Sequence, residues 1–408
     1  MIFYGFLASF PNDLNSYNKF HLPTKWTGSY MESIINQALN KHEKDEREKP
    51  RGKTLDDVDK EKIEEAPEDE ELRNLLETLE VKIRIFGCGG GGCNTLDRLT
   101  QEGISGAELI ACNTDAKHLL HTHAQKKVLI GKNTTRGLGA GARPEIGEES
   151  ARESKEDLKK HMEGADIVFI TAGMGGGTGT GVAPVVAELA KEEEALVMGI
   201  VTLPFEGEGK ERMKNAKKGL SKLERYCDTT VIIPNDKLLE LVPNLSLNAA
   251  FKVADEILME SIKGMTEIIT KPGLVNLDYN DVRTIMDDGG VAMIGIGDSD
   301  DPNNRVDDAV NQAIGSPLLG EIDLSDANGA LIRVTGGPDM TVTEAERAAD
   351  LVNEKISGDA RIIWGCNVEE DLKNTMKILL VITNVHSESD QLAHKSMLGS
   401  GDGIDMVN

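Results

Sequence analysis

Aromatic residues and long apolar runs are scarce in this chain of 408 residues, and each shortage excludes a class of protein. Aromatics make up only 4% of the residues, so a surface that stacks the bases of single-stranded nucleic acid is not expected. No stretch approaches the roughly 18 consecutive apolar residues of a membrane-spanning helix. The apolar stretch Ile2–Phe10 is short, follows no basic residue and precedes a proline, unlike a signal peptide. We therefore expect no direct insertion into a membrane.

Paired cysteines and basic charge are lacking as well. The five cysteines form no CxxC pair, which predicts a reduced, cytoplasmic protein rather than a disulfide framework. The formal net charge is −25, so most of the surface repels nucleic acid, and no nucleic-acid partner is expected. An anionic ligand would have to be held by backbone amides or by a local basic patch.

The first 80 residues differ in texture from the rest of the chain. Residues 1–30 match nothing later in the chain, and Met31 opens a segment that resembles a natural start. We therefore interpret residues 1–30 as non-native, arising from an upstream start codon or an added segment. Residues 42–71 are dominated by charge, which predicts a solvated arm. Together they form an N-terminal extension over residues 1–80.

Residues 81–248 alternate buried-looking strands with helices, the pattern of a parallel sheet covered on both faces. The expected strands are Val81–Phe86, Glu108–Cys112, Asp166–Ala172, Leu196–Thr202 and Thr229–Pro234. A long helix is expected over Ala249–Thr270, because its apolar residues recur every three or four positions.

The remainder of the chain behaves as a second, smaller unit over residues 272–386. Its expected strands and its clearest helix are Val291–Ile296, Ala330–Val334, Arg361–Gly365, Lys377–Thr383 and the helix Thr343–Ile356. Residues 387–408 are polar and rich in Ser and Gly, and they predict a flexible tail.

Two glycine clusters each follow an expected strand and precede an expected helix. The first is Gly87–Gly92 (GCGGGG), before a helix expected near Asn94; the second is Gly175–Gly181 (GGGTGTG). Glycine lets the backbone wrap around phosphate oxygens, and the amides of a helix N-terminus supply donors. Thr178 and Thr180 can add hydroxyl donors. Two such turns in one sheet predict a nucleoside-phosphate site.

A dinucleotide site is the rival interpretation. Gly87, Gly89 and Gly92 fit the GxGxxG fingerprint, and Asp115 lies at a suitable distance to hold a ribose hydroxyl. A nicotinamide-binding fold has no use for GGGTGTG after a later strand, however. The chain also lacks the P-loop motif GxxxxGK[ST], so the anion would be neutralised by amides, hydroxyls and a bound cation.

The GGGTGTG segment resembles the signature of the tubulin/FtsZ family, and further segments are similar to FtsZ, in particular to archaeal members, in order and spacing. These segments are Gly87–Asn94, Cys112–Lys117, Gly137–Gly147, Val201–Met213, Ile233–Leu239 and Gly273–Met286. The resemblance covers roughly residues 81–385. It implies an α/β fold in which a Rossmann-type parallel-sheet GTPase domain (81–248) is joined by a central helix (249–271) to a smaller α+β domain (272–386).

The resemblance also implies which residues bind GTP or GDP. They are Gly89, Gly90, Gly91, Gly92, Asn94, Asn113, Asp115, Gly139, Ala140, Gly141, Gly175, Gly176, Gly177, Thr178, Gly179, Thr180, Gly181, Glu208, Arg212, Asn235 and Asp255. Asn113 and Asp115 would lie near the phosphates and a Mg²⁺ ion that is bound mainly through them. Asn235 and Asp255 would read the base, because a carboxylate accepts both N1–H and N2–H₂ of guanine, and adenine has no such pair. Two departures are Cys93, where a fifth glycine is usual, and Leu203, where lysine is common.

Hydrolysis is implied to depend on Asn276, Asp278 and Asp281, on a loop that projects into the nucleotide site of the next subunit. There the two carboxylates would orient the water that attacks the γ-phosphate. Without the resemblance, Asp278 and Asp281 would be interpreted as the N-cap and first-turn acid of a helix beginning near Asp281.

Two other patterns have simpler explanations. His118, His121 and His123 suggest a metal site, but only the first two share a helix face and no ligand completes the set, so a structural or surface role is expected and no protein metal site is predicted. Gly403–Val407 (GIDMV) resembles the peptide with which FtsZ proteins dock a membrane adaptor, SepF-like in archaea, although it could be an ordinary frayed terminus.

The combined prediction is a GTPase that polymerises head-to-tail into protofilaments and forms the division ring at midcell. Two alternatives stay open: a filament of the tubulin superfamily that serves cell shape, and a Rossmann-like nucleotide-binding enzyme that forms no polymer.

Overall fold

A computed structural model describes residues 81–385, apart from 242–246, 272, 276, 320–323, 325, 326, 357, 359, 371 and 373. The predicted non-native start, the charged arm and the tail with its GIDMV peptide all lie outside the described residues. Apart from the first two residues of one helix, Val342 and Thr343, the described elements belong to one compact unit that begins at Val81.

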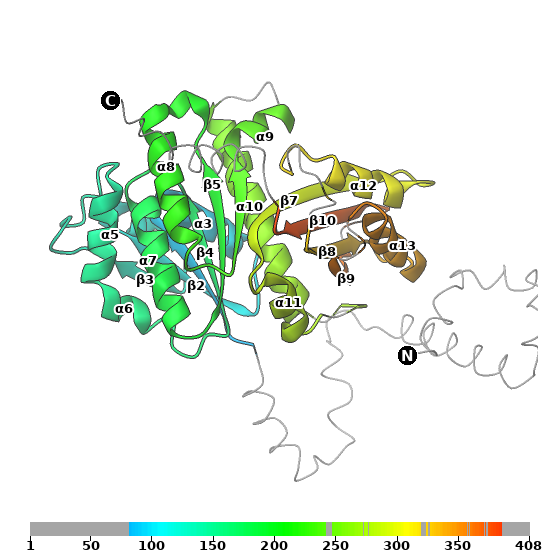
Figure 1. Cartoon of the computed structure of the whole chain (residues 1–408), viewed down its shortest axis with the longest axis horizontal. Coiled ribbons are helices and arrows are strands. Elements are labelled where there is room, and N and C mark those ends of the chain that lie inside the picture. Colours follow the sequence, from blue (N-terminus) through cyan, green and yellow to red (C-terminus); the bar gives the residue numbers. More distant parts are fainter. Residues whose placement is uncertain are drawn as a thin grey trace, which may run out of the picture. The chain divides into compact units, whose positions relative to one another are not determined.

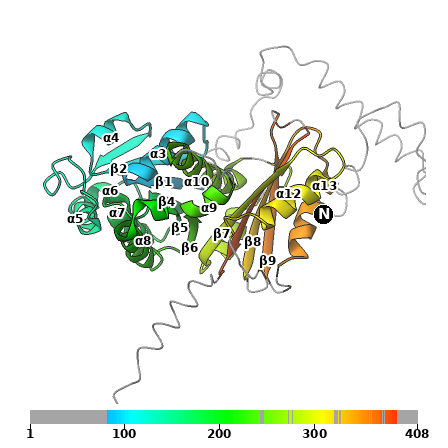
Figure 2. The same ribbon diagram turned by 90° about the horizontal axis from the view of Figure 1, so that it is seen from above.

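A single ten-stranded sheet runs through this unit, in the order β3-β2-β1-β4-β5-β6-β7-β10-β8-β9 (Figure 2). Neighbouring strands are parallel from β3 to β7, whereas β10 is antiparallel to both β7 and β8. The strands are β1 (Ile83–Cys88), β2 (Ala107–Asn113), β3 (Lys126–Leu129), β4 (Ile167–Gly173), β5 (Leu196–Leu203), β6 (Thr229–Pro234), β7 (Gly290–Ser299), β8 (Gly329–Gly336), β9 (Arg361–Val368) and β10 (Met376–Thr383).

Helices cover both faces of the parallel strands, as the sequence predicts. Figure 2 shows α3 and α10 on one side of β1, β4 and β5, with α7 and α8 on the other. The helices are α3 (Gly89–Gln101), α4 (Ala116–His121), α5 (Pro144–Glu153), α6 (Lys155–Lys159), α7 (Thr178–Glu192), α8 (Lys210–Leu223), α9 (Asn235–Leu241), α10 (Leu247–Thr270), α11 (Tyr279–Met286), α12 (Arg305–Ile314) and α13 (Val342–Asn353).

The two faces bury separate apolar clusters, because successive side chains of a strand point to opposite sides. Ile83 and Ile85 of β1 pack in one cluster with Leu96 of α3, while Phe86 packs in the other with Val182 of α7. The cluster around α3 also includes α10 together with residues of β5 and β8. Helix α10 therefore connects the first six strands with the last four (Figure 1).

Several boundaries differ from those predicted. Helix α3 begins at Gly89 rather than near Asn94, because the positive φ of Gly89 (71°) turns the chain directly from strand to helix. Helix α11 begins at Tyr279, two residues before the predicted start. Strand β3 was not predicted, since Lys126 and Lys127 leave it too few apolar residues. The four strands of the expected second unit extend the first sheet through the pairing of β6 with β7.

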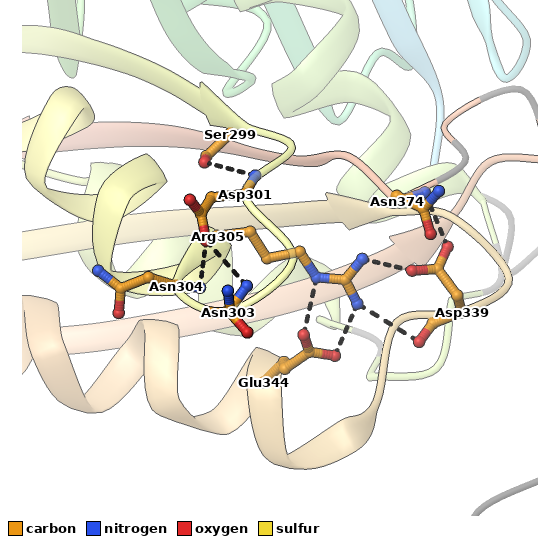
Figure 3. Close-up of polar contacts among 8 residues, drawn as sticks. All are labelled: Ser299, Asp301, Asn303, Asn304, Arg305, Asp339, Glu344 and Asn374. Carbon is orange, nitrogen blue, oxygen red and sulfur yellow. Dashed lines mark hydrogen bonds and ion pairs between the residues drawn. The ribbon is translucent and has the colours of Figure 1, made fainter.

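An arginine joins the starts of the two helices in the last part of the chain. Arg305, at the first position of α12, donates from Nε and Nη2 to both carboxylate oxygens of Glu344 at 2.7 and 2.9 Å. It also pairs with the carboxylate of Asp339 (Figure 3). The Arg305 side chain is only 11% exposed, so this ion pair is largely sheltered from water.

Candidate active site

The first glycine loop touches the second. Strand β1 ends at Cys88, and an ideal Cβ placed on Gly89 would lie 2.6 Å from the backbone nitrogen of Gly179. Only glycine allows such a close approach. As a result the N-termini of α3 and α7 lie side by side, and both helices direct backbone N–H groups and the positive ends of their dipoles to one region.

The second glycine loop is held in shape by its own threonines. The backbone N–H of Gly175, whose φ is 101°, donates to Oγ1 of Thr180 at 2.8 Å. Thr180 is buried and acts within the loop, whereas the hydroxyl of Thr178 lies 2.7 Å from the hydroxyl of Thr114. That contact ties the loop after β2 to the loop after β4.

The loops after β2 and before α5 close around the same place. Asp115 caps α4 by accepting from the N–H groups of Lys117 and His118 at 2.9 and 3.0 Å. The N–H of Gly139 donates to the carbonyl of Thr114 at 3.1 Å. An ideal Cβ on Gly177 would lie 2.9 Å from the Cβ of Ala140, so the Gly139–Gly141 segment reaches the second glycine loop.

A cavity of about 410 Å³ opens at the carboxyl ends of the parallel strands, between these loops and α10. The predicted binding residues that line it are Gly90, Gly91, Asn94, Gly176, Gly177, Thr178, Gly179, Glu208, Arg212, Asn235 and Asp255. The other predicted residues, which do not line it, are Gly89, Gly92, Asn113, Asp115, Gly139, Ala140, Gly141, Gly175, Thr180 and Gly181. Among the latter, Asp115, Gly175 and Thr180 have their polar groups engaged in shaping the loops.

Polar groups at the α9 and α10 side of the cavity are buried and partly unsatisfied. Asn235 is 4% exposed, and its Oδ1 has no hydrogen-bond partner among the described residues. Burial raises the pKa of Asp255 to about 6, although the nearby Arg98 guanidinium acts in the opposite direction. Phe251 is 37% exposed and meets Phe205 edge-to-face, with ring centroids 5.1 Å apart. A planar polar ring would supply donors to Asn235 and Asp255 and an apolar face to Phe251.

Near β5 the cavity has one strong cation, and it is already paired. Arg212 of α8 forms an ion pair with Glu208, one turn earlier. Glu208 also accepts from the N–H of Phe205 at 3.0 Å. The Arg212 side chain is 51% exposed, so it is free to turn toward an anion in the cavity.

Several lining residues were not identified from the sequence. They are His118, Gly173, Met174, Thr202, Pro204, Phe251 and Ala254. Phe251 lies on the apolar face of an expected helix, where it could not be distinguished from a core residue. His118 belonged to a histidine pattern interpreted as structural. Cys93, by contrast, is buried in the core behind the loop, where its sulfur lies 3.7 Å from the Asn113 amide nitrogen.

The predicted catalytic carboxylates lie at the opposite end of the sheet. Asp278 caps α11, accepting from the N–H of Asp281 at 2.9 Å, and Asp281 accepts in return from the N–H of Asp278 at 3.3 Å. Both side chains are exposed, and Asn276 lies outside the described residues. The structure thus shows the capping arrangement that the sequence alone favours.

The length of strand β4 sets the distance between the carboxylates and the cavity. The hydroxyl of Tyr279 donates to the carbonyl of Asp166 at 3.3 Å, immediately before β4 begins, while Gly173 at the other end of β4 lines the cavity. Seven residues of strand span about 20 Å. Figure 1 shows α9 and α11 at opposite ends of the sheet, so one molecule does not bring its own carboxylates to its own cavity.

The segment before α11 is fixed to strand β9. The N–H of Leu274 donates to the carbonyl of Cys366 at 3.0 Å, and the N–H of Cys366 donates to the carbonyl of Val275 at 3.2 Å. An ideal Cβ on Gly273 would lie 2.4 Å from the Cys366 carbonyl oxygen. The loop that leads to Asp278 is therefore attached to the last strand of the sheet.

The described residues form neither a cluster of metal ligands nor a membrane-spanning helix. Within the described part of the chain, no group of three or more His, Cys, Asp or Glu side chains is placed to hold a metal ion. None of the helices described is both long and apolar enough to cross a bilayer.

Known proteins match the chain along most of its length. Residues 82–243 match the GTPase domain of the tubulin/FtsZ family, and residues 290–386 match the C-terminal domain of the FtsZ family. The cell division protein FtsZ 1 of Archaeoglobus fulgidus is 51% identical over 358 residues, 88% of this chain and 94% of that protein. The protein of the same name from Methanocaldococcus jannaschii is 53% identical over 325 residues, 80% of this chain and 89% of that protein.

Solved structures give the same result. An empty FtsZ dimer from M. jannaschii superposes with a TM-score of 0.75 at 53% identity, covering 78% of this chain and 93% of the other. A GTPγS-bound protofilament of CetZ2 from Haloferax volcanii gives a TM-score of 0.65 at 23% identity, covering 78% and 99%. The second match shows a shared fold alone.

Proposed function

Since this chain belongs to the tubulin/FtsZ family, we propose that it is a GTPase whose subunits join head-to-tail into protofilaments of the cell-division ring. The observation that carries the proposal is the placement of the nucleotide cavity and the acidic loop at opposite ends of one sheet. A contact that joins one end to the other does not close on itself, and repeating it produces a filament.

GTP would occupy the cavity with its phosphates toward the glycine loops and its base toward α10. The backbone N–H groups of Gly176–Gly179 and the first turn of α3 would hold phosphate oxygens. Asp255 would accept from N1–H and N2–H₂ of guanine, and Asn235 would use its unpaired oxygen on the same ring. Phe251 would cover a face of the base.

A Mg²⁺ ion would be held mainly through the phosphates, which is its usual mode in nucleotide sites. The residues expected near it fit this arrangement, since Asp115 is engaged in capping α4 and Asn113 in accepting from the N–H of Asp115 at 3.1 Å. The ion would supply positive charge for the γ-phosphate during hydrolysis.

Hydrolysis would be completed by the next subunit. Asp278 and Asp281 are exposed at the amino end of α11, where they can enter a neighbour's cavity, accept hydrogen bonds from a water and orient it toward the γ-phosphate. Charge that develops on the phosphoryl oxygens would be taken up by the loop amides.

Light scattering of the full chain with GTP and Mg²⁺ tests the proposal. We expect scattering to rise above a threshold protein concentration and phosphate release to start at that same concentration, with no rise when GDP replaces GTP. Phosphate release at a constant rate per molecule, without any rise in scattering, would identify a nucleotide hydrolase that does not assemble.

Two finer points concern the cell. A filament for cell shape would have the same GTPase chemistry. The two roles are distinguished by where the protein gathers in the cell: at midcell in the cytoplasm for division, and elsewhere for cell shape.

We also propose that Gly403–Val407 docks a SepF-like membrane adaptor. Removal of Gly403–Asn408 should abolish adaptor binding in a pull-down, and unchanged binding would exclude this peptide.

A further inference from the structure

One histidine of the HLLHTH pattern reaches the nucleotide cavity. His118 lies in the first turn of α4, where the Asp115 carboxylate accepts its backbone N–H at 3.0 Å and so fixes its position. Its side chain lines the cavity. His123 is directed elsewhere, to the carboxylate of Asp97 at 3.0 Å, and His121 is exposed and outside the cavity lining.

The His118 ring lies against the first two turns of α3. Its Nε2 lies 3.2 Å from Oδ1 of Asn94, and an ideal Cβ on Gly90 would lie 3.4 Å from its Cε1. An amide oxygen only accepts hydrogen bonds, so Nε2 carries the hydrogen and donates it. The side chain of Asn94 is thereby held by its oxygen, and its NH₂ group, which has no partner among the described residues, is left for a ligand.

The Asn94 NH₂ group is an uncharged donor in a cavity that has few cationic side chains. Besides His118, the ionisable side chains on the lining are the acids Glu208 and Asp255 and the Arg212 guanidinium, which is paired with Glu208. A nucleotide brings further negative charge and many acceptor oxygens. Donors near Gly90 that are fixed before binding would save the cost of ordering them afterwards.

We propose that His118 is a positioning residue for the nucleotide. Its Nε2–H holds the Asn94 side-chain oxygen, so that the Asn94 NH₂ group faces an acceptor oxygen of the bound guanine nucleotide, on the ribose or on a phosphate. This inference rests on the proposed nucleotide-binding function and adds a residue to it.

Calorimetric titration of the full chain with GDP tests the coupling. We expect His118→Ala to weaken GDP binding about 3- to 10-fold, the effect of one hydrogen bond. Adding His118→Ala to Asn94→Ala should cost no more than Asn94→Ala alone, because His118 acts through Asn94. His118→Gln, which keeps a side-chain N–H donor, should recover part of the affinity. His121→Ala, three residues away on the same helix, is the matched control and should bind as the parent does.

Two results would overturn the inference: parental affinity in His118→Ala, or losses that multiply in the double variant. Both results are ratios of a variant's GDP affinity to that of the parent protein, so they can be obtained only if the parent binds GDP. If the parent does not bind GDP, the proposed function itself is wrong. Repeating the titrations with 2′,3′-dideoxy-GDP identifies the acceptor. The His118→Ala loss disappears if Asn94 contacts a ribose hydroxyl and persists if it contacts a phosphate.

Discussion

At the scale of single residues, the proposed nucleotide site includes polar atoms that are buried before any ligand is bound. Asn235 buries an amide oxygen that has no partner among the described residues. Burial also raises the pKa of Asp255, which means that the ionised carboxylate is held in an unfavourable environment. A bound base that donates hydrogen bonds to these two groups removes both energetic penalties. A base that lacks those donors leaves the two groups buried without partners. We expect selectivity for guanine to follow from this difference.

The raised pKa of Asp255 predicts a pH dependence of GDP binding. Only the ionised carboxylate accepts from both guanine N–H groups, because protonation converts one of its oxygens into a donor, so protonation competes with binding. Because the pKa in the free protein is about 6, affinity should be constant above that pH and fall by up to about tenfold per pH unit below it. Dissociation constants measured between pH 5 and pH 8 test this. Asp255→Asn is the control, because the phosphates of GDP titrate equally in both measurements while the amide does not titrate. Its GDP affinity should therefore lack the fall below pH 6 that is due to Asp255. Identical pH profiles for the two proteins would contradict the assignment.

At the scale of elements, the site depends on two loops that touch. Gly89 has a positive φ of 71° and lies against the backbone of Gly179, so it holds the N-termini of α3 and α7 together. Gly103 has a similar φ of 67° but open space around its Cβ position. A side chain at Gly103 would therefore cause backbone strain alone, whereas a side chain at Gly89 would also collide with the other loop.

Substitution of these glycines should have unequal effects. Gly89→Ala forces the two loops apart and should weaken GDP binding more than about tenfold. Gly103→Ala meets only backbone strain of about 1 kcal/mol and should leave GDP affinity unchanged. Calorimetry gives both affinities, and urea unfolding shows whether the folded fractions are comparable. Equal GDP affinities in the two variants would show that loop contact does not shape the site.

The ion pair between α12 and α13 predicts a change in stability. Arg305→Met removes a largely buried guanidinium from Glu344 and Asp339, and the free energy of unfolding should fall by about 2 kcal/mol. Arg347 joins the same two helices through Asp307 but is 55% exposed, so Arg347→Met should cost at most about 1 kcal/mol. Urea unfolding measures the free energy of unfolding of both variants. Equal losses in the two would show that burial of the Arg305 ion pair does not increase its contribution to stability.

Much of the fold and part of the site could be predicted from sequence. The apolar strands and the two glycine turns were predicted within a few residues, because their patterns are local, and the family matches confirm the predicted fold class and GTPase function. Strand β3 was missed because pairing with β2, rather than its own composition, makes it a strand. Phe251 and His118 were missed as lining residues, since which side of a helix faces a cavity depends on contacts between distant segments.

At the scale of the whole molecule, the cavity and the acidic loop lie at different ends of the sheet. The cavity lies at the carboxyl ends of the parallel strands, and Asp278 and Asp281 lie beyond the amino ends. A change in the acidic loop should therefore spare nucleotide binding by the subunit that carries it. The same loop also starts α11 through its capping contacts, so a test must separate the two roles.

Asp281→Asn makes that separation. The amide keeps an oxygen to accept from the N–H of Asp278 but loses the charge that would orient the water. We expect unchanged GTP affinity, assembly by light scattering, and phosphate release reduced at least about 100-fold. Asp281→Ala should show the same loss together with a less stable α11. Parental turnover in either variant would exclude the shared site.

The attachment of Leu274 and Val275 to Cys366 also limits strand pairing at one edge of the sheet. Strand β9 is the last in the sheet order, and an outermost strand offers unpaired backbone groups to which a foreign strand can add. Here both backbone groups of Cys366, near the carboxyl end of β9, are already bonded to the loop. The segment that leads to Asp278 thus also occupies part of the outer edge of β9, in the place where a strand of a neighbouring molecule would otherwise pair.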